Sequence, residues 1–451
     1  MLYHLFVPLK DSISAFRLFE YVTFRAAFAA VLAFLVATVV GPGVIDALRR
    51  RKIAGFSPTG SEHVDAERKA KESVPTMGGV ILLVGVALAG FLFVRLDLPQ
   101  TWIVLVSFLL FGLLGAMDDW KKLTHRKGEG MSERQKLLGQ LLISGAAITA
   151  LYGIGCAQEG RPWLRGPSLQ PNPYPVHVTR AGDSWESLAA HYLGSPARAR
   201  ELAQVNDRLD ASGQPEPLGP GRSVRVPAAP GVLHRADLQV PFFKRFCLDL
   251  GLLFIPLGIL VIVGASNAVN LTDGLDGLAI GVTATVATTF VVVGYLVGSV
   301  AVARGLYLFH VPEGGELAII AAALVGGALG FLWFNAHPAS VFMGDTGSLS
   351  IGGILGVLAV ALRHELTLLL AGGLFVVEAL SVIWQRTWFK ATKRAAARRG
   401  EADPQGKRWF LCAPVHHHFQ RTGLHENKVT VRFWIVSVIC VVAALATLKL
   451  R

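Results

Sequence analysis

Ten apolar stretches dominate this chain of 451 residues, and most approach the roughly 20 residues that cross a lipid bilayer as a helix. They lie near residues 22–44, 77–95, 101–117, 137–155, 247–265, 277–299, 317–334, 349–362, 366–384 and 430–448, and the eighth is the shortest. Only 16% of the residues are charged, against about 25% in soluble globular proteins. We therefore predict an all-α polytopic membrane protein with about ten transmembrane helices.

The basic residues are concentrated in loops that follow odd-numbered stretches, at 45–76, 118–136 and 385–429. Loops rich in lysine and arginine stay in the cytoplasm, so these loops are predicted to face it. Both chain ends and the long loop after the fourth stretch then lie outside. The net charge of +12 accordingly reflects membrane topology and not binding to nucleic acid.

Four polar motifs also follow odd-numbered stretches, namely MDDWKK at 117–122, NLTDGLDG at 270–277, NAHPASVFMGDTGS at 335–348 and PVHHHFQ at 414–420. All four are consequently predicted on the cytoplasmic face. Ionisable groups at membrane depth are costly and usually mark a functional site. We predict one site there, assembled from motifs that are far apart in the sequence.

The residue types in these motifs suit chemistry on phosphate. Crowded carboxylates need a compensating cation, and oxygen ligands suit Mg²⁺, which also bridges substrate phosphates. Lysines hold further anionic oxygens, and histidines donate to phosphate or relay protons near neutral pH. The candidates are Asp118, Asp119, Asp273, Asp276, Asp345, Lys71, Lys122, Lys136 and the histidines at 416–418. Together they favour phosphoryl transfer onto a lipid phosphate.

Each motif taken alone has a simpler explanation. Paired acids at a helix end are usually solvated, acids in a glycine-rich turn cap helices, and a histidine run binds metal fortuitously. The DTGS sequence at 345–348 matches aspartic proteases, but the chain has no second copy of it. Glu378, within the ninth stretch, fits an interhelical hydrogen bond at least as well as catalysis. The joint occurrence of the motifs on one face favours a catalytic site.

These motifs, together with KESVPTMGG at 71–79, resemble those of the bacterial phospho-N-acetylmuramoyl-pentapeptide transferase family. The resemblance covers all ten stretches in the family's order, and the PVHHHF form separates this branch from other polyprenyl-phosphate sugar-1-phosphate transferases. It implies transfer of phospho-N-acetylmuramoyl-pentapeptide from its UDP derivative to undecaprenyl phosphate, giving lipid I and UMP, with Mg²⁺ as cofactor. It also implies a homodimer in the bacterial inner membrane.

The resemblance implies a role for each motif position. Asp345 matches the magnesium ligand, and Asp118 matches the residue proposed as base or nucleophile toward the lipid phosphate, with Asp119 beside it. The positions that match the nucleotide and diphosphate site are Asn267, Asn270, Asp273 and Asp276. Those that match other polar positions of the cleft are Lys71, Thr76, Lys122, Lys136, Asn335, Ser348, Gln385, His416 and His417. Because the lipid phosphate is a dianion near neutral pH, we favour its direct attack over a covalent enzyme intermediate.

A polar segment at 172–232 separates the first four predicted helices (1–155) from the last six (247–451). It is predicted outside the membrane, with a strand at VHVT, a helix at GDSWESLAAHY capped by Asp183 and Glu186, a second helix, and a closing strand at RSVRVP. This β-α-α-β order resembles the LysM module, which implies binding to peptidoglycan glycan chains. A spacer that docks a partner is the alternative.

Some alternatives stay open at this point. Cys156 and Cys247 flank the polar segment and would form a disulfide at the outer surface, although small apolar cysteines at helix ends are ordinary. The functional alternatives are a sibling N-acetylhexosamine-1-phosphate transferase, a lipid or ion transporter, and an inactive scaffold. A transporter usually holds its acids near the bilayer midplane and often has repeated halves. Neither property is evident in this sequence.

Overall fold

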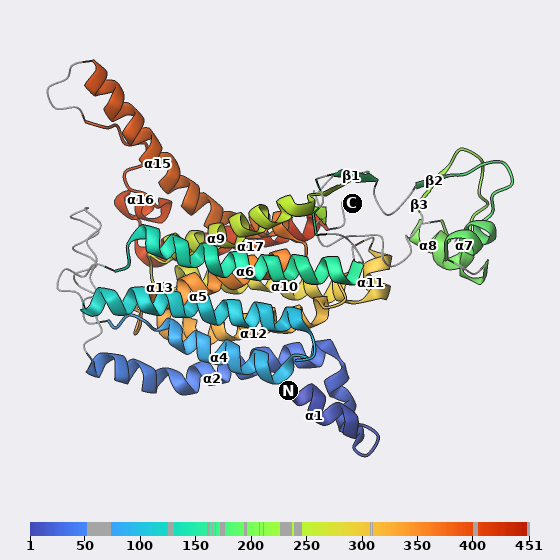
Figure 1. Cartoon of the computed structure of the whole chain (residues 1–451), viewed down its shortest axis with the longest axis horizontal. Helices are drawn as coiled ribbons and strands as arrows, with labels where there is room; N and C mark the ends of the chain where they lie inside the picture. The colour runs from blue at the N-terminus through green and yellow to red at the C-terminus, as the bar shows by residue number, and fades with distance from the viewer. Residues whose placement is uncertain are drawn as a thin grey trace.

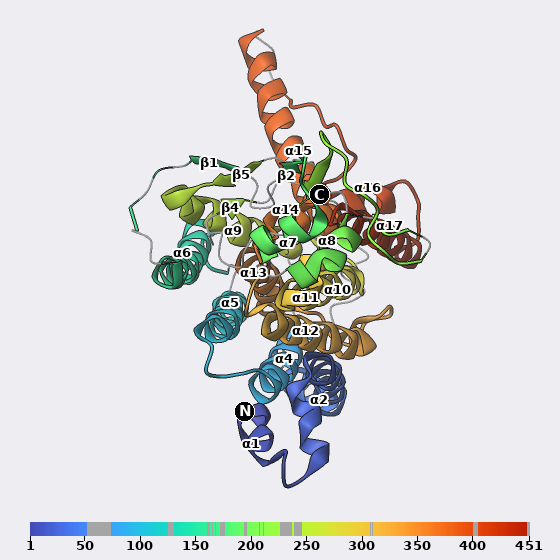
Figure 2. The same cartoon turned by 90° about the vertical axis from the view of Figure 1, so that its right-hand side faces the viewer.

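The computed structural model of the chain describes residues 1–51, 74–124, 130–159, 246–306, 308, 310–399 and 405–448, with short stretches between 163 and 238. Its main body is a bundle of long helices that run roughly side by side (Figures 1 and 2). The long helices are α2 (Val22–Arg50), α4 (Gly79–Phe93), α5 (Pro99–Thr124), α6 (Glu133–Glu159), α9 (Phe254–Thr272), α10 (Leu278–Gly298), α12 (Gly314–Asn335), α13 (Gly344–Ala361), α15 (Gly373–Arg398) and α17 (Glu426–Thr447), and the short α14 (Glu365–Ala371) precedes α15. Shorter helices are α1 (Leu2–Phe6), α11 (Val300–Gly305) and α16 (Val415–Arg421).

Each of the ten predicted stretches coincides with helix in the described residues. Among the described residues, eight helices are long and apolar enough to cross a membrane, and α14 with α15 adds a ninth, bent crossing if the two form a single span. The remaining stretch is α4, which is apolar but only 15 residues long. The chain is therefore an all-α polytopic membrane protein, as the sequence predicts.

The fifth and ninth predicted helices differ from the expectation in detail. The fifth was predicted from residue 247, but Phe246–Asp249 is a strand and the helical span runs over Gly251–Thr272. The ninth was predicted as continuous, yet α14 and α15 meet at 82°. The break falls at two adjacent glycines, Gly372 and Gly373, which leave the backbone free to turn. The first part of α15 packs against α9 and α17, and its later part projects from the bundle (Figure 1).

The centre of the bundle is α13, which packs against α5 and α9 (Figure 2). All its residues from Thr346 to Ala361 are buried. Helices in lipid associate mainly by close packing through small residues, and this bundle follows that rule. At Gly326 of α12, for example, an added Cβ would overlap the backbone oxygen of Ala30 in α2.

A buried ion pair joins α2 to α12 at the end of the bundle where both helices begin. The Nη1 and Nη2 atoms of Arg25 donate to the two carboxylate oxygens of Glu316, at 2.7 Å each. Arg25 also donates to the carbonyl of Phe93, and Glu316 accepts the N–H of Arg95 at 2.8 Å. Both side chains of the pair are almost fully buried, at 2% and 7% exposure.

Replacing Glu316 by alanine is expected to lower the free energy of unfolding by about 3–5 kcal/mol, because it leaves the buried Arg25 charge without its partner. Denaturant titration in detergent measures this change. The matched control is Asp11→Ala, since Asp11 pairs with Arg17 at 3.5 Å with both side chains mainly exposed. Such surface pairs contribute only about 0–1 kcal/mol. Equal losses in the two variants would contradict the role given to the buried pair.

The polar insertion folds as a small unit of its own. Its described elements are β2 (Val176–Val178), α7 (Trp185–Leu193), a 3-10 turn (Pro196–Arg198), α8 (Ala199–Val205) and β3 (Ser223–Arg225). β2 and β3 pair antiparallel, so the predicted β-α-α-β order is confirmed. Trp185 is buried in the core of this unit, and its Nε1 donates to the carbonyl of Glu216.

The cap of the first insertion helix differs from the prediction. The capping pair is Ser184 with Ser187, each hydroxyl accepting the other's backbone N–H at 3.1 and 2.9 Å. The predicted pair of Asp183 and Glu186 is one residue out of register, because α7 begins at Trp185. Asp183 instead accepts the N–H of Arg180.

Strand pairing closes the base of the insertion. β1 (Ser168–Pro171), β5 (Phe246–Asp249) and β4 (Asp237–Leu238) form an antiparallel sheet in the order β1-β5-β4. Cys156 is a buried free thiol in α6, and the Cys247 side chain lies outside the described residues. The insertion lies at the end of the bundle opposite α16 (Figure 1).

Candidate active site

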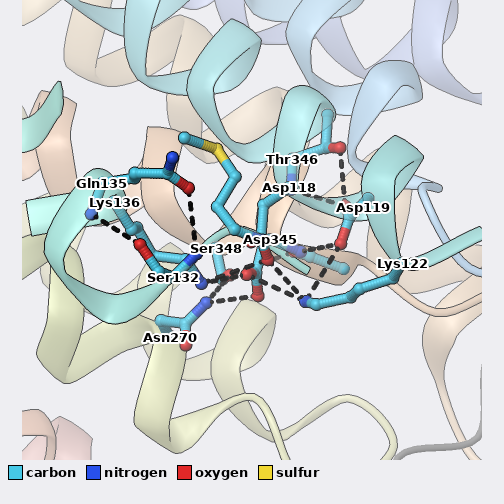
Figure 3. A network of polar contacts seen from close by, with 12 residues as sticks. Asp118, Asp119, Lys122, Ser132, Gln135, Lys136, Asn270, Asp345, Thr346 and Ser348 are labelled. Atoms are coloured by element: carbon cyan, nitrogen blue, oxygen red, sulfur yellow. Dashed lines mark hydrogen bonds and ion pairs between the residues drawn. The ribbon is translucent and has the colours of Figure 1, made fainter. Parts of the chain in front are cut away.

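The predicted polar motifs meet at one end of the bundle. The ends of α5 and α9, the beginning of α13, and α16 all lie there, at the left in Figure 1. Asp118 and Asp119 are on the last turns of α5, and Asp345 is on the first turn of α13. Ligand oxygens of these three acids lie within 4.8 Å of one another. We call these residues the acid cluster; Figure 3 shows them converging.

Two lysines neutralise most of the charge of the acid cluster. Lys122 Nζ lies 2.7 Å from Asp118 Oδ2, 3.0 Å from Asp345 Oδ2 and 3.5 Å from Asp119 Oδ1. Lys136, from the first turns of α6, bridges Asp118 Oδ2 at 3.2 Å and Asp345 Oδ2. With all five groups ionised, three negative charges face two positive ones, so one negative charge remains.

Asp119 holds the N-terminus of α13 in place. Its carboxylate accepts the N–H of Asp345 at 3.2 Å, the N–H of Thr346 at 2.9 Å and the hydroxyl of Thr346 at 2.7 Å. The first backbone N–H groups of a helix have no partner within the helix, and the helix dipole also stabilises a carboxylate at this position. Asp119 therefore acts as a cap supplied by another helix and sets the position of Asp345.

Asp345 is the most accessible acid of the acid cluster. Its side chain is 13% exposed, against 1% for Asp118 and 3% for Asp119. Its Oδ1 accepts from Asn270 Nδ2 at 2.7 Å, and the same amide donates to Ser348 Oγ at 2.9 Å. Asp118 is enclosed, because its Oδ1 accepts the N–H of Met131 at 2.7 Å and its Oδ2 faces both lysines.

The donor set of the acid cluster fits a hard divalent cation. All three ligand groups are carboxylates, and Mg²⁺ prefers oxygen ligands in small number, completed by water and substrate phosphate. The unbalanced negative charge favours binding of a cation. Asp345 is the best placed ligand, because it is the acid that solvent reaches most easily.

The second acidic motif forms a tight turn between α9 and α10. Asp273 is the C-terminal cap of α9 and is half-buried, and Gly277 adopts a left-handed conformation at φ 73°. Asp276 is buried, and its Oδ2 accepts from His337 Nδ1 at 2.9 Å and from the N–H of Ala339 at 3.1 Å. Asn335 bridges the same turn, accepting the N–H of Gly277 and donating to the carbonyl of Val341.

His416 is buried beside this turn and pairs with Glu378 of α15. The Nδ1 atom of His416 lies 3.1 Å from Glu378 Oε2, and both side chains are fully buried. Its Nε2 faces Gly274, where an added Cβ would overlap it. The contact joins α15 to α16, so Glu378 has the interhelical bond that the sequence left open beside a part in catalysis. His417, also buried, pairs with Gln420 at 2.6 Å.

Glu378→Leu is expected to lower kcat/KM of the reaction catalysed at this site by about 10-fold or more, because His416 loses the acceptor that sets its tautomer. Glu378→Gln keeps an acceptor oxygen and is expected to lose less. Initial rates are measured beside thermal unfolding of each variant. A folded Glu378→Leu protein with wild-type rates would show that the orientation of His416 has no part in the reaction.

The remaining predicted site residues that the structure describes lie outside the acid cluster. Thr76 lies close to Gly344, in a segment whose Pro75 carbonyl accepts the N–H of Phe342. Asn267 donates to Gln140 of α6. Gln385 lies on α15, where it binds the backbone of Trp409 and Phe410. Lys71 lies outside the described residues.

Three supporting residues were not among the predicted site residues, namely Gln140, His337 and Glu426. His337 is part of the NAHPASVFMGDTGS motif, but only Asn335, Asp345 and Ser348 of that motif were assigned to the site. Glu426 lies in the first turn of α17, where acidic residues are common because they stabilise the N-terminus of a helix. Only the packing of distant segments reveals their contacts with the motifs.

The helical membrane fold and the acid cluster together define a polytopic membrane protein equipped for phosphate chemistry. Residues 226–363 match the family model of glycosyl transferase family 4. Curated proteins named phospho-N-acetylmuramoyl-pentapeptide-transferase from Maridesulfovibrio salexigens, Desulfotalea psychrophila and Citrifermentans bemidjiense are 37%, 38% and 38% identical to it. Each alignment covers 100% of this chain and 100% of the relative. The chain belongs to the phospho-N-acetylmuramoyl-pentapeptide transferase family.

Proposed function

We propose that this chain transfers phospho-N-acetylmuramoyl-pentapeptide from UDP-N-acetylmuramoyl-pentapeptide to undecaprenyl phosphate. A lipid phosphate oxygen bonds to the β-phosphorus of the donor, the bond to the bridging oxygen breaks, and UMP leaves, so that lipid I forms. The acid cluster with its two lysines is the observation that carries this proposal. It lies at the bundle end where the family's motifs meet, and family membership supplies the substrates.

We assign Asp345 as the principal ligand of Mg²⁺. When bound, Mg²⁺ neutralises charge that develops on the phosphates during displacement. The chain's own residues then position the groups. Asp119 holds Asp345 through the N-terminus of α13, and Asn270 orients its second oxygen. Lys122 and Lys136 are placed to receive phosphate oxygens, because they already bind carboxylate oxygens in this structure.

Direct attack by the lipid phosphate fits the surroundings of Asp118 better than a covalent intermediate does. One oxygen of Asp118 is bonded to a backbone N–H and the other faces two ammonium groups, and its side chain is 1% exposed. A nucleophile must reach phosphorus in line with the leaving group. Asp118 therefore serves to hold the lysines rather than to attack.

The lipid acceptor has an apolar site close to α16. A cavity of about 500 Å³ lies between α15, α16 and α17 and is lined by apolar side chains such as Leu374, Phe419 and Phe433. It adjoins the helix that carries His416. We propose that this cavity receives part of the polyprenyl chain, so that the phosphate end points toward the acid cluster.

The proposal also places the protein in the membrane. We propose that the active-site end faces the cytoplasm of the bacterial inner membrane, since the described basic residues in the last turns of α2, α5 and α15 lie at that end (Figure 1). The insertion and both chain ends then lie outside, where a LysM-like unit would meet peptidoglycan glycan chains. A homodimer is proposed from family membership alone.

The test is UMP release by the purified protein given undecaprenyl phosphate. UDP-N-acetylmuramoyl-pentapeptide is compared with UDP-N-acetylglucosamine, each with and without Mg²⁺. Magnesium-dependent release from the muramoyl donor alone is expected. Release from the N-acetylglucosamine donor would move the chain to a sibling activity, and release from neither would contradict the proposal.

A further inference from the structure

The turn formed by Asp276 and Gly277 is held at every backbone polar group. The N–H of Asp276 donates to Glu426 Oε1 at 2.7 Å, and its carbonyl accepts from Thr430 Oγ1 at 3.3 Å. The N–H of Gly277 donates to Asn335 Oδ1 at 3.1 Å, and its carbonyl accepts from Trp434 Nε1 at 3.2 Å. Such complete pairing fixes the turn in one conformation, since each unpaired buried group would cost about 1–3 kcal/mol.

Three of these four contacts come from one face of α17. Glu426, Thr430 and Trp434 are spaced four residues apart, so they lie one above the other on a helix. The acid cluster, by contrast, draws its described contacts from α5, α6, α9 and α13. The last helix of the chain is thus attached to the other side of the site, at the α9–α10 turn.

The carboxylate of Asp276 is also used as a support. It is buried, with Oδ2 bonded to the His337 ring and to the N–H of Ala339. These contacts tie the turn to the loop between α12 and α13, and that loop leads into Asp345. The position of the turn is therefore coupled to the segment that carries Asp345.

We infer that Glu426, Thr430 and Trp434 of α17 are positioning residues, which hold the Asp276–Gly277 turn in the shape that binds the UDP portion of the donor. This inference rests on the proposed function and on the match of Asp273 and Asp276 to the nucleotide and diphosphate site of the family. Loosening the turn removes binding that is shared by ground state and transition state, so KM rises while kcat changes little.

Glu426→Ala is the first variant, because it removes the acceptor of the Asp276 N–H. KM for UDP-N-acetylmuramoyl-pentapeptide and the dissociation constant of UMP are both expected to rise about 10-fold, with kcat nearly unchanged. Glu426→Gln keeps an acceptor oxygen and is expected to stay near wild type. Trp434→Phe keeps the aromatic packing but loses the N–H that binds Gly277, so it tests the inference with less risk to folding.

The matched control is Ile435→Ala, on the same helix but with an exposed side chain. It is expected to leave KM, kcat and UMP binding unchanged. Wild-type activity with unchanged KM in both Glu426→Ala and Trp434→Phe would overturn the inference, as would a loss confined to kcat. A wild-type protein that neither binds UMP nor releases it contradicts the proposed function instead.

Discussion

Asp345→Asn is expected to lower kcat/KM for UMP release by about 10³-fold, equivalent to about 4 kcal/mol of transition-state stabilisation. The substitution keeps the shape of the side chain and an oxygen that accepts from Asn270. It removes only the charge, which in the proposed site binds the cation and balances Lys122 and Lys136. Steady-state UMP release at saturating Mg²⁺ measures the loss.

Asp46→Asn is the matched control for this prediction. Asp46 is an exposed acid near the end of α2, at the same end of the bundle, and it is outside the acid cluster. The same chemical change there should leave UMP release at the wild-type rate. A small effect of Asp345→Asn, comparable to that of Asp46→Asn, would mean that the charge of Asp345 has no special part in the reaction.

Gly115→Ala is expected to lower the rate of UMP release by about 10²-fold, although it adds one methyl group. Gly115 lies on α5 directly against the first turn of α13. An added Cβ would overlap the backbone oxygen of Asp345 and lie 2.6 Å from the nitrogen of Thr346. Because both atoms belong to the backbone, α13 must move away from α5, which displaces Asp345 from Asp118 and Asp119.

Gly264→Ala serves as the control for helix glycines in general. It lies within α9, where an added Cβ meets no atom within 4 Å. Alanine favours helix over glycine by about 1 kcal/mol, so this variant should be fully active and no less stable. Activity and thermal unfolding are measured for both variants. A fully active Gly115→Ala protein would show that the close approach of α5 and α13 is not needed for the acid cluster.

The membrane fold could be predicted from the sequence because every crossing is a continuous apolar segment. The prediction was wrong at two places, where the local sequence pattern fits more than one structure and the surrounding packing decides between them. The apolar residues of β5 were taken for the start of α9, since a short apolar run does not distinguish strand from helix. The bend between α14 and α15 falls at a Gly-Gly pair, whose effect depends on the helices around it.

The residues of the acid cluster could also be found from the sequence, because several polar motifs follow apolar stretches on the same predicted face, and ionisable groups at membrane depth usually mark a functional site. Their individual roles could not. Asp118 and Asp119 are adjacent in the sequence, yet one holds the lysines and the other caps α13. The sequence does not distinguish the role of Asp276 from that of Asp273 in the same motif, because its partners His337 and Glu426 lie 61 and 150 residues away. Such roles follow from tertiary contacts.

The fate of the β-phosphate tests the central claim most directly. Purified protein is given undecaprenyl phosphate and UDP-N-acetylmuramoyl-pentapeptide labelled with radioactive phosphorus at the β position. Direct transfer at the acid cluster predicts that all transferred label appears in the lipid product, in a 1:1 ratio to UMP, with none on the protein. Label recovered in the nucleotide product, as inorganic phosphate, or attached to the denatured protein would contradict it.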